Sequence, residues 1–313
     1  MPDTPPKSAN FYAGGLDRAS HLRKDAAWLA ERLPHATSRF VPVWRGQNLI
    51  ADYESAAPHG VFLPPEAIAA ADYEIVLLGI ESDGAYFAVD LSAMETPLDT
   101  IKAPELWSQG PPAAFSDLRR VGPLLPRHEA SLLAFARGMS YWHSRHRFCG
   151  VCGSPTRGEE AGHVRRCTNE ACNAPHFPRT DPAVIMLVHD RDERCLLGRQ
   201  AAWPQGMHST LAGFVEPGES LEEAVAREVY EETSVTLASV TYHSSQPWPF
   251  PASLMLGFHA EAKSTEIVVD QTELEAAHWY EKSWLLAHQD DEHFRLPRRD
   301  SIARRLLEDW LRR

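Results

Sequence analysis

Short alternating segments, followed by a longer segment with helical spacing, make up the first half of the chain. Two hairpins are predicted there, because each pair of alternating apolar and polar runs is separated by a short polar turn. The four runs are residues 39–44, 48–51, 73–81 and 85–92. A helix that packs in a core is predicted next, from about 128 to 146. Its apolar residues with helical spacing are Leu132, Phe135, Met139 and Trp142.

The second half of the chain shows a different succession of apolar runs. We predict five strands there, each a short apolar or alternating run. They are residues 183–188, 194–198, 208–213, 235–242 and 253–260. A C-terminal helix is expected from about Asp300 to Leu311. Strands mixed with helices in this way predict an α/β (α+β) fold, with a mixed sheet flanked by helices.

The length of 313 residues is enough for two or three domains, and a hydrophobic content of 43% supports packed cores. We place an N-terminal α+β domain at 1–125, a linking helix with a cysteine-rich segment at 126–178, and a third domain at 179–313. Residues 103–112 are expected to form a loop. No apolar run is long enough to cross a membrane, and the first residues lack a signal-peptide pattern. We therefore expect no membrane segment and a cytoplasmic location.

The net charge of −12 argues against general affinity for nucleic acid backbones. Five arginines nevertheless gather in the middle of the sequence. They are Arg145, Arg147, Arg165, Arg166 and Arg179. Because arginine binds phosphate oxygens in a bidentate manner, a phosphate-binding patch is one interpretation. Solvated surface arginines are the other, and both stay open at this point.

A short acidic helix carries the strongest candidate chemistry. The helix is expected to begin after Ser220, which has the spacing of a capping box with Glu223. Glu228 and Glu232, four residues apart, continue its apolar stripe, and Glu231 lies at the edge of that stripe. Buried carboxylates are costly unless they are paired or metal-bound, and oxygen ligands suit Mg²⁺ or Mn²⁺. The alternative is a solvated acidic helix with an ion pair between Glu223 and the arginine four residues later.

Two close pairs of cysteines form a second candidate site. They are Cys149, Cys152, Cys167 and Cys172. Four thiolates can close a tetrahedral site around Zn²⁺ with no position left for water, so a structural zinc ion is expected. A disulfide or a redox dithiol is the alternative, but nothing in the sequence indicates an oxidising compartment or a βαβ setting. Cys195 is expected to be a small buried thiol. Four nearby histidines are expected to be surplus to the zinc ligands: His143, His146, His163 and His176.

The segment Ser245–Ser253, with the sequence SQPWPFPAS, is a third distinctive feature. Three prolines alternate with Trp248 and Phe250, and each proline restricts its own φ angle. We therefore predict a stiff loop that displays aromatic rings and amide groups. Taken alone, the pattern also suits a hydrophobic surface loop.

The acidic segment resembles the Nudix box, in which glycine, glutamate, an Arg-Glu pair and two adjacent glutamates follow at fixed spacing. The matching residues are Gly213, Glu219, Arg227, Glu228, Val229, Glu231, Glu232 and Val235. The chain departs from the family at Ser234, where the family has the glycine that suits a left-handed helix end. Serine there is expected to cost about 1 kcal/mol. The resemblance implies the Nudix fold, a mixed-sheet α/β/α sandwich.

The box, the four cysteines and SQPWPFPAS together resemble the NADH pyrophosphatase subgroup of Nudix hydrolases, over about residues 125–313. This resemblance implies a zinc ribbon around the cysteines and an N-terminal Nudix-like α+β domain. It also implies that Mg²⁺ or Mn²⁺ is bound by Ala212 (through its carbonyl), Glu228, Glu231, Glu232 and Glu273. Catalytic roles are implied for Glu231, Glu232 and Glu273, with Arg227 orienting the glutamates. The implied substrate-binding residues are Phe177, Phe214, Gln246, Pro247, Trp248, Pro249, Phe250, Pro251, Ala252, Ser253 and Ala303.

The activity implied by the resemblance is hydrolysis of the pyrophosphate bond of NADH or NAD. The products would be (reduced) nicotinamide mononucleotide and AMP, and the NAD cap of RNA would be a further substrate. Members of the subgroup are typically homodimers, so a homodimer is expected. Two alternatives stay open: a Nudix hydrolase for ADP-ribose or another nucleoside diphosphate derivative, and a zinc-ribbon RNA-binding or regulatory protein with an inert Nudix module.

Overall fold

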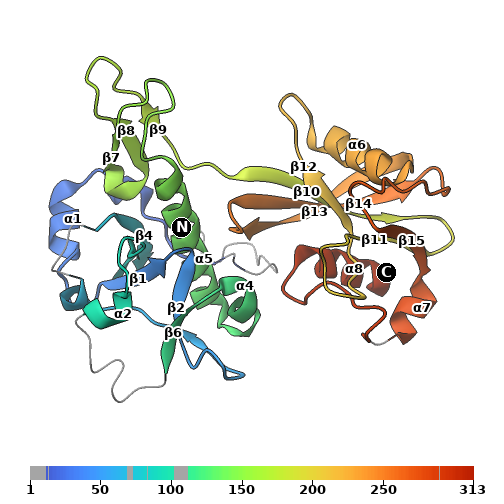
Figure 1. Ribbon diagram of the computed structural model, residues 1–313, viewed down its shortest axis with the longest axis horizontal. Coiled ribbons are helices and arrows are strands. Elements are labelled where there is room, and N and C mark those ends of the chain that lie inside the picture. Colours follow the sequence, from blue (N-terminus) through green and yellow to red (C-terminus); the bar gives the residue numbers. More distant parts are fainter. Residues whose placement is uncertain (1–11, 13, 69–72, 83, 102–111, 289) are drawn as a thin grey trace. The chain divides into compact units, whose positions relative to one another are not determined.

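The computed structural model describes residues 12, 14–68, 73–82, 84–101, 112–288 and 290–313 (Figure 1). The chain forms two compact units. The first comprises Met1–Thr180 with Trp248–Ala252, and the second comprises Asp181–Pro247 with Ser253–Arg313. Most of the loop expected at 103–112 lies outside the described residues. No helix in the described parts of the chain is both long and apolar enough to cross a membrane.

The first unit is built on a six-stranded sheet with the order β3-β2-β1-β5-β4, in which β6 also pairs with β2. The strands are β1 (Arg39–Trp44), β2 (Gln47–Ala51), β3 (His59–Gly60), β4 (Ile75–Glu81), β5 (Gly84–Asp90) and β6 (Ala113–Ser116). The antiparallel pairs β1–β2 and β4–β5 are the two hairpins predicted from the sequence. β1 and β5 then pair in parallel and join the hairpins into one sheet.

Helices cover both faces of this first sheet. Helix α5 (Arg127–Arg145) is the long helix predicted from apolar spacing, and its buried residues pack with Val43 and Val76 of the sheet. Side chains from α1 (Ala26–Arg32) pack against the cluster on the other face, which contains Phe87. The shorter helices are α2 (Pro97–Thr100) and α4 (Leu118–Val121), with 3-10 turns at Ser20–Leu22, Pro65–Ala67, Gly122–Leu124 and Glu160–Gly162.

The four cysteines of the predicted zinc site flank a small antiparallel sheet. Its strands are β7 (Thr156–Glu159), β8 (Val164–Cys167) and β9 (Pro175–His176). The first cysteine pair precedes β7, and the second pair lies at the end of β8 and in the turn before β9. This local hairpin therefore brings the two pairs toward each other.

The second unit contains a mixed sheet with the order β13-β14-β10-β11-β15, in which β12 also pairs with β10. Its elements are β10 (Asp181–His189), β11 (Arg194–Arg199), β12 (Leu211–Phe214), α6 (Leu221–Thr233), β13 (Leu237–Trp248), β14 (Ser253–Ala262), β15 (Ala276–Glu281), α7 (Lys282–Ala287) and α8 (Ile302–Arg312). β10 runs parallel to β14 and antiparallel to β11 and β12. This arrangement confirms the predicted mixed sheet.

Alternation along the central strand β10 determines which helix covers which face. Val184 and Met186 belong to the core that contains the apolar residues of α6. Ile185 and Leu187 belong to the separate core that contains the apolar residues of α8. Because successive strand residues point to opposite faces, α6 and α8 cover the two sides of the sheet (Figure 1). The second unit is therefore an α/β/α sandwich, as expected.

Several predicted boundaries in the second unit are wrong. The strand expected at 208–213 begins only at Leu211, because Ser209 makes an isolated bridge to Gly198 instead. The strand expected to end at residue 242 continues to Trp248. It tolerates Pro247 because β13 lies at the sheet edge, where a missing backbone N–H breaks no ladder. β15 and α7 were not predicted at all.

Candidate metal and substrate sites

Local sequence determines where helix α6 begins and ends. The Ser220 hydroxyl accepts a hydrogen bond from the Glu223 backbone N–H, and the Glu223 carboxylate accepts one from the Ser220 N–H. This is the predicted capping box. The helix ends at Ser234, which has the left-handed φ of 59° expected of the family's glycine. Ala224, Val225 and Val229 are buried beneath the helix and hold it on the sheet.

The glycine that opens the box makes room for a carboxylate. A Cβ atom on Gly213 would lie only 1.8 Å from the carboxyl carbon of Glu228. Any larger residue at position 213 would displace the Glu228 side chain. Ala212, the expected backbone ligand, is the preceding residue of the same strand. The Glu228 carboxylate therefore lies directly against the strand that carries Ala212.

Three carboxylates gather beside this strand. Ligand oxygens of Glu228, Glu232 and Glu273 all lie within 4.8 Å of one another. Glu228 and Glu232 are only 8% and 3% exposed, whereas Glu273 is exposed. Glu273 reaches the cluster from the segment after β14, which is joined to α6 by a hydrogen bond from Asp270 N–H to the Glu232 carbonyl. A helix and a distant loop therefore combine to form the cluster.

The electrostatics of this cluster suit a bound cation. Burial, together with the nearby carboxylates Glu228 and Glu273, raises the pKa of Glu232 to about 8. Burial also raises the pKa of Glu228, although Arg227 acts in the opposite direction. Within the described part of the chain, Glu232 Oε2 is buried without a hydrogen-bond partner. Clustered carboxylate oxygens, one of them buried without a protein partner, fit a hard divalent cation.

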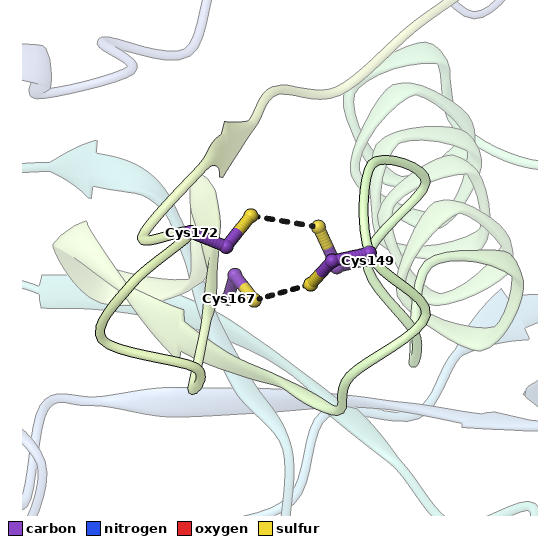
Figure 2. Close-up of side chains that lie close together, drawn as sticks. Cys149, Cys167 and Cys172 are labelled. Carbon is purple, nitrogen blue, oxygen red and sulfur yellow. Dashed lines mark hydrogen bonds between the residues drawn. The ribbon is translucent and has the colours of Figure 1, made fainter.

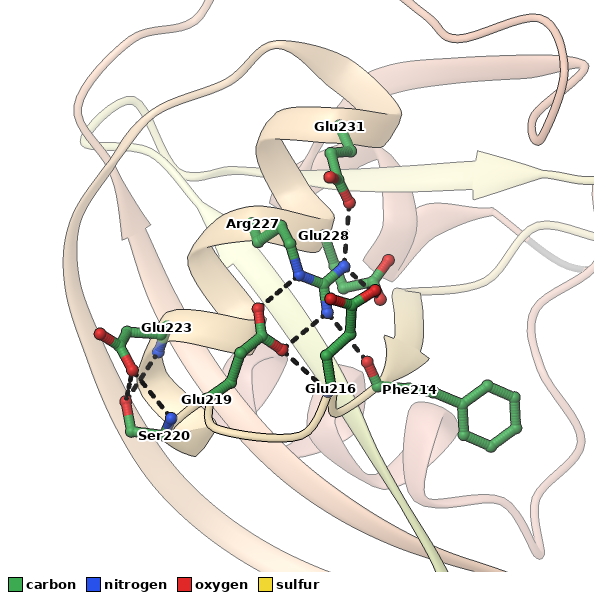
Figure 3. A network of polar contacts seen from close by, with 8 residues as sticks. All are labelled: Phe214, Glu216, Glu219, Ser220, Glu223, Arg227, Glu228 and Glu231. Carbon is green, nitrogen blue, oxygen red and sulfur yellow. Dashed lines mark hydrogen bonds and ion pairs between the residues drawn. The ribbon is translucent and has the colours of Figure 1, made fainter.

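Arg227 organises the acidic side chains around this cluster, as Figure 3 shows. Its guanidinium donates to Glu219 at 2.6 and 2.9 Å, to Glu228 and Glu231 at 2.9 Å, and to the Phe214 carbonyl at 2.9 Å. These bonds lower the pKa of Glu219 to about 2 and raise that of Arg227. The alternative pair between Glu223 and Arg227 does not form, because Glu223 is held in the capping box. Glu231 is half-exposed and pairs with Arg227, outside the three-carboxylate cluster.

The four cysteines converge on one point (Figure 2). Cys149 Sγ lies 3.8 Å from Cys172 Sγ, and Cys152 Sγ lies 3.4 Å from Cys167 Sγ. Thiolates about 2.3 Å from a tetrahedral zinc ion lie about 3.8 Å apart, so these distances fit Zn²⁺. They are too long for disulfide bonds, and all five cysteines are free. Cys195 is fully buried on β11, as expected.

The nearby histidines and arginines mostly serve the internal structure. Nε2 of the buried His143 bonds the Gly162 carbonyl, and His163 bonds the Leu77 carbonyl, each at 2.7 Å. Arg165 is also buried, where it donates to Glu74 and Thr156. It is therefore not free to bind a phosphate. The other two histidines also form hydrogen bonds inside the first unit: His146 Nδ1 with the Trp142 carbonyl, and His176 Nε2 with Cys149 Sγ. Arg166 donates a hydrogen bond to Glu159.

The expected substrate-binding residues fall in both units. Gln246 is fully buried: its amide nitrogen donates to the Asp300 carbonyl and its oxygen accepts from the Ile302 N–H, both at 2.7 Å. Ala303 follows in the first turn of α8 and is also buried. Phe214 is 60% exposed in the second unit, with its ring turned away from Arg227 (Figure 3). In the first unit, Phe177 is 50% exposed, and Trp248 and Phe250 are half-buried.

The remaining residues of the SQPWPFPAS segment form its turn and edges. Pro247 lies in β13, Pro249 is buried, Pro251 is exposed, Ala252 is half-buried, and Ser253 begins β14. Two partners of this turn were not predicted from the sequence. The Tyr12 ring contacts the Phe250 ring, and the guanidinium of Arg137 lies over the same ring. No local pattern marks either residue, because both contacts join segments far apart in the chain.

Comparisons with known proteins agree with this geometry. Residues 179–299 match the NUDIX domain. Residues 144–177 match the NADH pyrophosphatase zinc ribbon domain, and residues 37–142 match the NADH pyrophosphatase-like rudimentary NUDIX domain. The three matches follow one another along the chain and cover the acidic cluster, the cysteine site and the first sheet.

Named relatives share these segments. The chain is 45% identical to the NAD-capped RNA hydrolase NUDT12 of Homo sapiens over 198 residues, which are 60% of this chain and 43% of that protein. It therefore spans less than half the length of that relative. It is 44% identical over 220 residues to Nudix hydrolase 19, chloroplastic, of Arabidopsis thaliana, covering 66% of this chain and 49% of that protein. The NAD-capped RNA hydrolase NudC of Mycobacterium bovis is 38% identical over 311 residues, covering 95% of this chain and 92% of that protein. The chain belongs to the Nudix hydrolase family, in the group that carries the NADH pyrophosphatase zinc ribbon.

Proposed function

We propose that this protein hydrolyses the pyrophosphate bond of NADH and NAD, and removes the NAD cap from RNA. The observation that carries the proposal is the cluster of Glu228, Glu232 and Glu273, in which Oε2 of the buried Glu232 has no hydrogen-bond partner among the described residues. The NUDT12 and NudC relatives are NAD-capped RNA hydrolases by name, which supports NAD-capped RNA as a substrate class. The products are nicotinamide mononucleotide, reduced when NADH is the substrate, and AMP.

Each site residue has a distinct task in this proposal. Glu228, Glu232 and Glu273, with the Ala212 carbonyl, hold Mg²⁺ or Mn²⁺. When bound, such ions neutralise diphosphate charge and lower the pKa of water. Arg227 keeps Glu228 and Glu231 in place through its hydrogen bonds. Glu231, Glu232 and Glu273 are the candidates to accept the proton of the attacking water.

The binding of the dinucleotide is assigned to aromatic and backbone groups. The exposed rings of Phe177 and Phe214 are suited to stacking on bases, because an exposed ring offers an apolar face without a competing partner. The segment Gln246–Ser253 and the backbone near Ala303 supply the remaining contacts. Within this segment Gln246 acts through its two internal hydrogen bonds, which hold the start of α8.

Several wider features belong to the same proposal. The zinc ribbon has a structural role, because four sulfur ligands leave no position for water. The three-part division at residues 125 and 178 and a cytoplasmic location stay predictions. We expect a homodimer, with a mass in solution of about 70 kDa, twice the 35.0 kDa of one chain.

Parallel kinetics on NADH, NAD, ADP-ribose and NAD-capped RNA test this function. The 313-residue chain is assayed with Mg²⁺ and with Mn²⁺, and the products are identified by chromatography. We expect metal-dependent formation of nicotinamide mononucleotide and AMP, with kcat/KM highest for NADH, NAD or the capped RNA. A strong preference for ADP-ribose would reject the proposed substrate. RNA binding without metal-dependent cleavage would instead support a regulatory protein.

A further inference from the structure

Five residues of the SQPWPFPAS segment belong to a different unit from the strands that carry them. Trp248–Ala252 is part of the first compact unit, although Pro247 and Ser253 on either side belong to the second. We call these five residues the aromatic turn. Trp248 and Phe250 of this turn pack against the buried cluster formed around α5. The surroundings of both rings therefore come from the N-terminal half of the chain.

Tyr12 forms a ring cluster with the aromatic turn. Its ring centroid lies 6.2 Å from that of Trp248 and 5.9 Å from that of Phe250, both with edge-to-face geometry. Trp248 and Phe250 are themselves edge-to-face at 5.0 Å. Tyr12 is only 4% exposed, and a Cβ atom on Gly122 would lie 2.3 Å from its hydroxyl oxygen. The tyrosine is thus fixed in place and restricts both rings of the turn.

Arg137 of helix α5 holds Phe250 through its charge. Its guanidinium carbon lies 4.7 Å from the centroid of the Phe250 ring. Its Nε donates a hydrogen bond to the Gly46 carbonyl at 2.8 Å, which fixes the side chain between the β1–β2 turn and the ring. Among the described residues, Arg137 Nη1 is buried without a hydrogen-bond partner. A partly desolvated guanidinium binds an aromatic face more strongly than an exposed one does.

Helix α5 also lies close to the turn at Gly138. Pro249 approaches the helix at Gly138, where an added Cβ atom would already touch the proline ring at 3.8 Å. Gly138 directly follows Arg137, so the same helical turn contacts Pro249 and Phe250. Arg119 also lies over Phe250, but at 5.8 Å and with its guanidinium bound to Asp117. Arg137 is therefore the stronger of the two cationic contacts.

We infer that Arg137 and Tyr12 are positioning residues that hold the aromatic turn in its binding conformation before the substrate arrives. This inference rests on the proposed function of the turn, and it assigns the N-terminal half of the chain a task in substrate binding. A turn that is already ordered loses less conformational entropy on binding than a free one. Loss of either residue should therefore weaken binding of the dinucleotide while the carboxylate cluster stays unchanged.

The variant Arg137→Leu in the zinc-loaded 313-residue chain tests this inference. Loss of a partly buried cation–π contact predicts a rise in KM for NADH of about three- to thirtyfold, with kcat within about twofold of the wild type. Arg120→Leu is the matched control, since Arg120 is an exposed arginine on α4. We expect Arg137→Lys to restore part of the lost affinity, because lysine retains the charge.

A spectroscopic readout makes the test independent of catalysis. The protein is labelled with 5-fluorotryptophan, and the ¹⁹F resonance of Trp248 is assigned with Trp248→Phe. We expect Arg137→Leu to shift or broaden this resonance and Arg120→Leu to leave it in place. If Arg137→Leu does not fold, Tyr12→Leu and Arg137→Lys are compared by the same two readouts.

The outcomes separate this inference from the proposed function. An unchanged KM with an unchanged Trp248 resonance would overturn the inference, as would a lower melting temperature without either change. If the wild-type protein fails to hydrolyse NADH with any metal, the proposed function fails. In that case the Trp248 resonance still decides whether Arg137 orders the turn.

Discussion

Glu232 is a carboxylate at a helix position that apolar spacing assigns to the core. It is almost completely buried, and it has two other carboxylates, Glu228 and Glu273, as neighbours. The resulting rise in its pKa means that ionising Glu232 in the metal-free protein is unfavourable. A bound divalent cation removes this cost, because an opposite charge nearby favours the carboxylate form. The burial and surroundings of Glu232 therefore fit the proposed metal role and do not favour stability.

Replacing Glu232 with glutamine separates these two roles. Glu232→Gln keeps the size of the side chain but removes the charge, so we expect kcat on NADH to fall by about a hundredfold or more. The melting temperature of the metal-free protein should stay the same or rise, since the most deeply buried carboxylate of the cluster is removed. Thermal unfolding in EDTA and steady-state kinetics measure the two effects. Near-normal turnover would contradict the metal role.

Glu74 is a carboxylate with the opposite shift. Hydrogen bonds from His143 and Arg165 lower its pKa to about 2, in spite of partial burial. Because the folded-state pKa lies below the ordinary value of 4.5, Glu74 contributes stability above pH 4.5. This contribution is lost as the pH falls from 4.5 toward 2. The network joins Glu74, the residue directly before β4, to helix α5 and to the zinc ribbon.

Glu74→Gln should expose this pH dependence. We expect a melting temperature about 3 °C below that of the wild type at pH 7, and a difference that shrinks as the pH falls from about 5 to about 3. Differential scanning calorimetry measures both values. Glu54→Gln, at an exposed glutamate, is the control. A difference that stays constant across this pH range would contradict the argument.

At the scale of an element, helix α6 has a favourable N-terminal cap and an unfavourable C-terminal one. The capping box satisfies backbone groups at its N-terminus, whereas Ser234 adopts a left-handed conformation that suits glycine. A residue with a Cβ atom in this region costs roughly 1 kcal/mol relative to glycine. This cost arises at the half-buried Ser234, one residue beyond the end of the helix.

Ser234→Gly should therefore stabilise the protein. We expect an increase of about 0.5–1 kcal/mol in the free energy of unfolding, measured by chemical denaturation. Activity should change little, because the substitution lies beyond the glutamates. Ser283→Gly in α7 is the matched control and should be destabilising, since glycine lowers helix stability at ordinary helical angles. A destabilised Ser234→Gly variant would contradict this account.

The zinc ribbon is an element whose stability we expect to depend on the metal site formed by its four cysteines. Its three strands contain two to four residues each, so they bury too little apolar surface to be stable alone. Cys149→Ser should lower both the zinc content and the melting temperature. Cys195→Ala, at the buried cysteine outside the ribbon, should retain zinc. Metal analysis by mass spectrometry and thermal unfolding check both variants, and a Cys149→Ser protein with full zinc content would contradict the structural role.

At the scale of the whole molecule, net charge governs how a long substrate approaches. The chain carries a formal charge of −12, which repels an RNA backbone. Recognition of capped RNA, under the proposed function, should therefore depend on the NAD end and not on the length of the RNA. Salt screens the repulsion, since charges separated by more than the Debye length interact weakly.

This charge predicts a salt effect that depends on RNA length. At low ionic strength we expect kcat/KM to be lower for a long NAD-capped RNA than for a capped trinucleotide, and the two values to converge as salt is added. Free NADH serves as the length-independent control. A long RNA that is cleaved faster at low salt, with the advantage lost at high salt, would instead indicate a local basic binding surface.

Predictions from the sequence succeeded where the determining residues are close together. The capping box, the long helix α5 and the two hairpins of the first sheet each depend on residues within a few positions of one another. The limits of β12 and β13 were wrong because pairing partners and sheet edges, not local spacing, decide where a strand ends. The elements β15 and α7 were missed for the same reason, since the long-range pairing of β15 with β11 defines that strand.

The sequence by itself determined the family, the helix that presents the box carboxylates and the cysteine pairs of the ribbon, because each depends on short-range spacing. The family resemblance already implied that Glu273 acts with Glu228 and Glu232, and the tertiary structure brings these three together. Only the tertiary structure decided that Glu231 pairs with Arg227 outside this cluster, and that the aromatic turn packs on Tyr12 and Arg137. These contacts join segments distant in the chain or depend on which side-chain geometry the surrounding core allows. Packing and the balance of buried charge select them, and neither can be read from the order of residues alone.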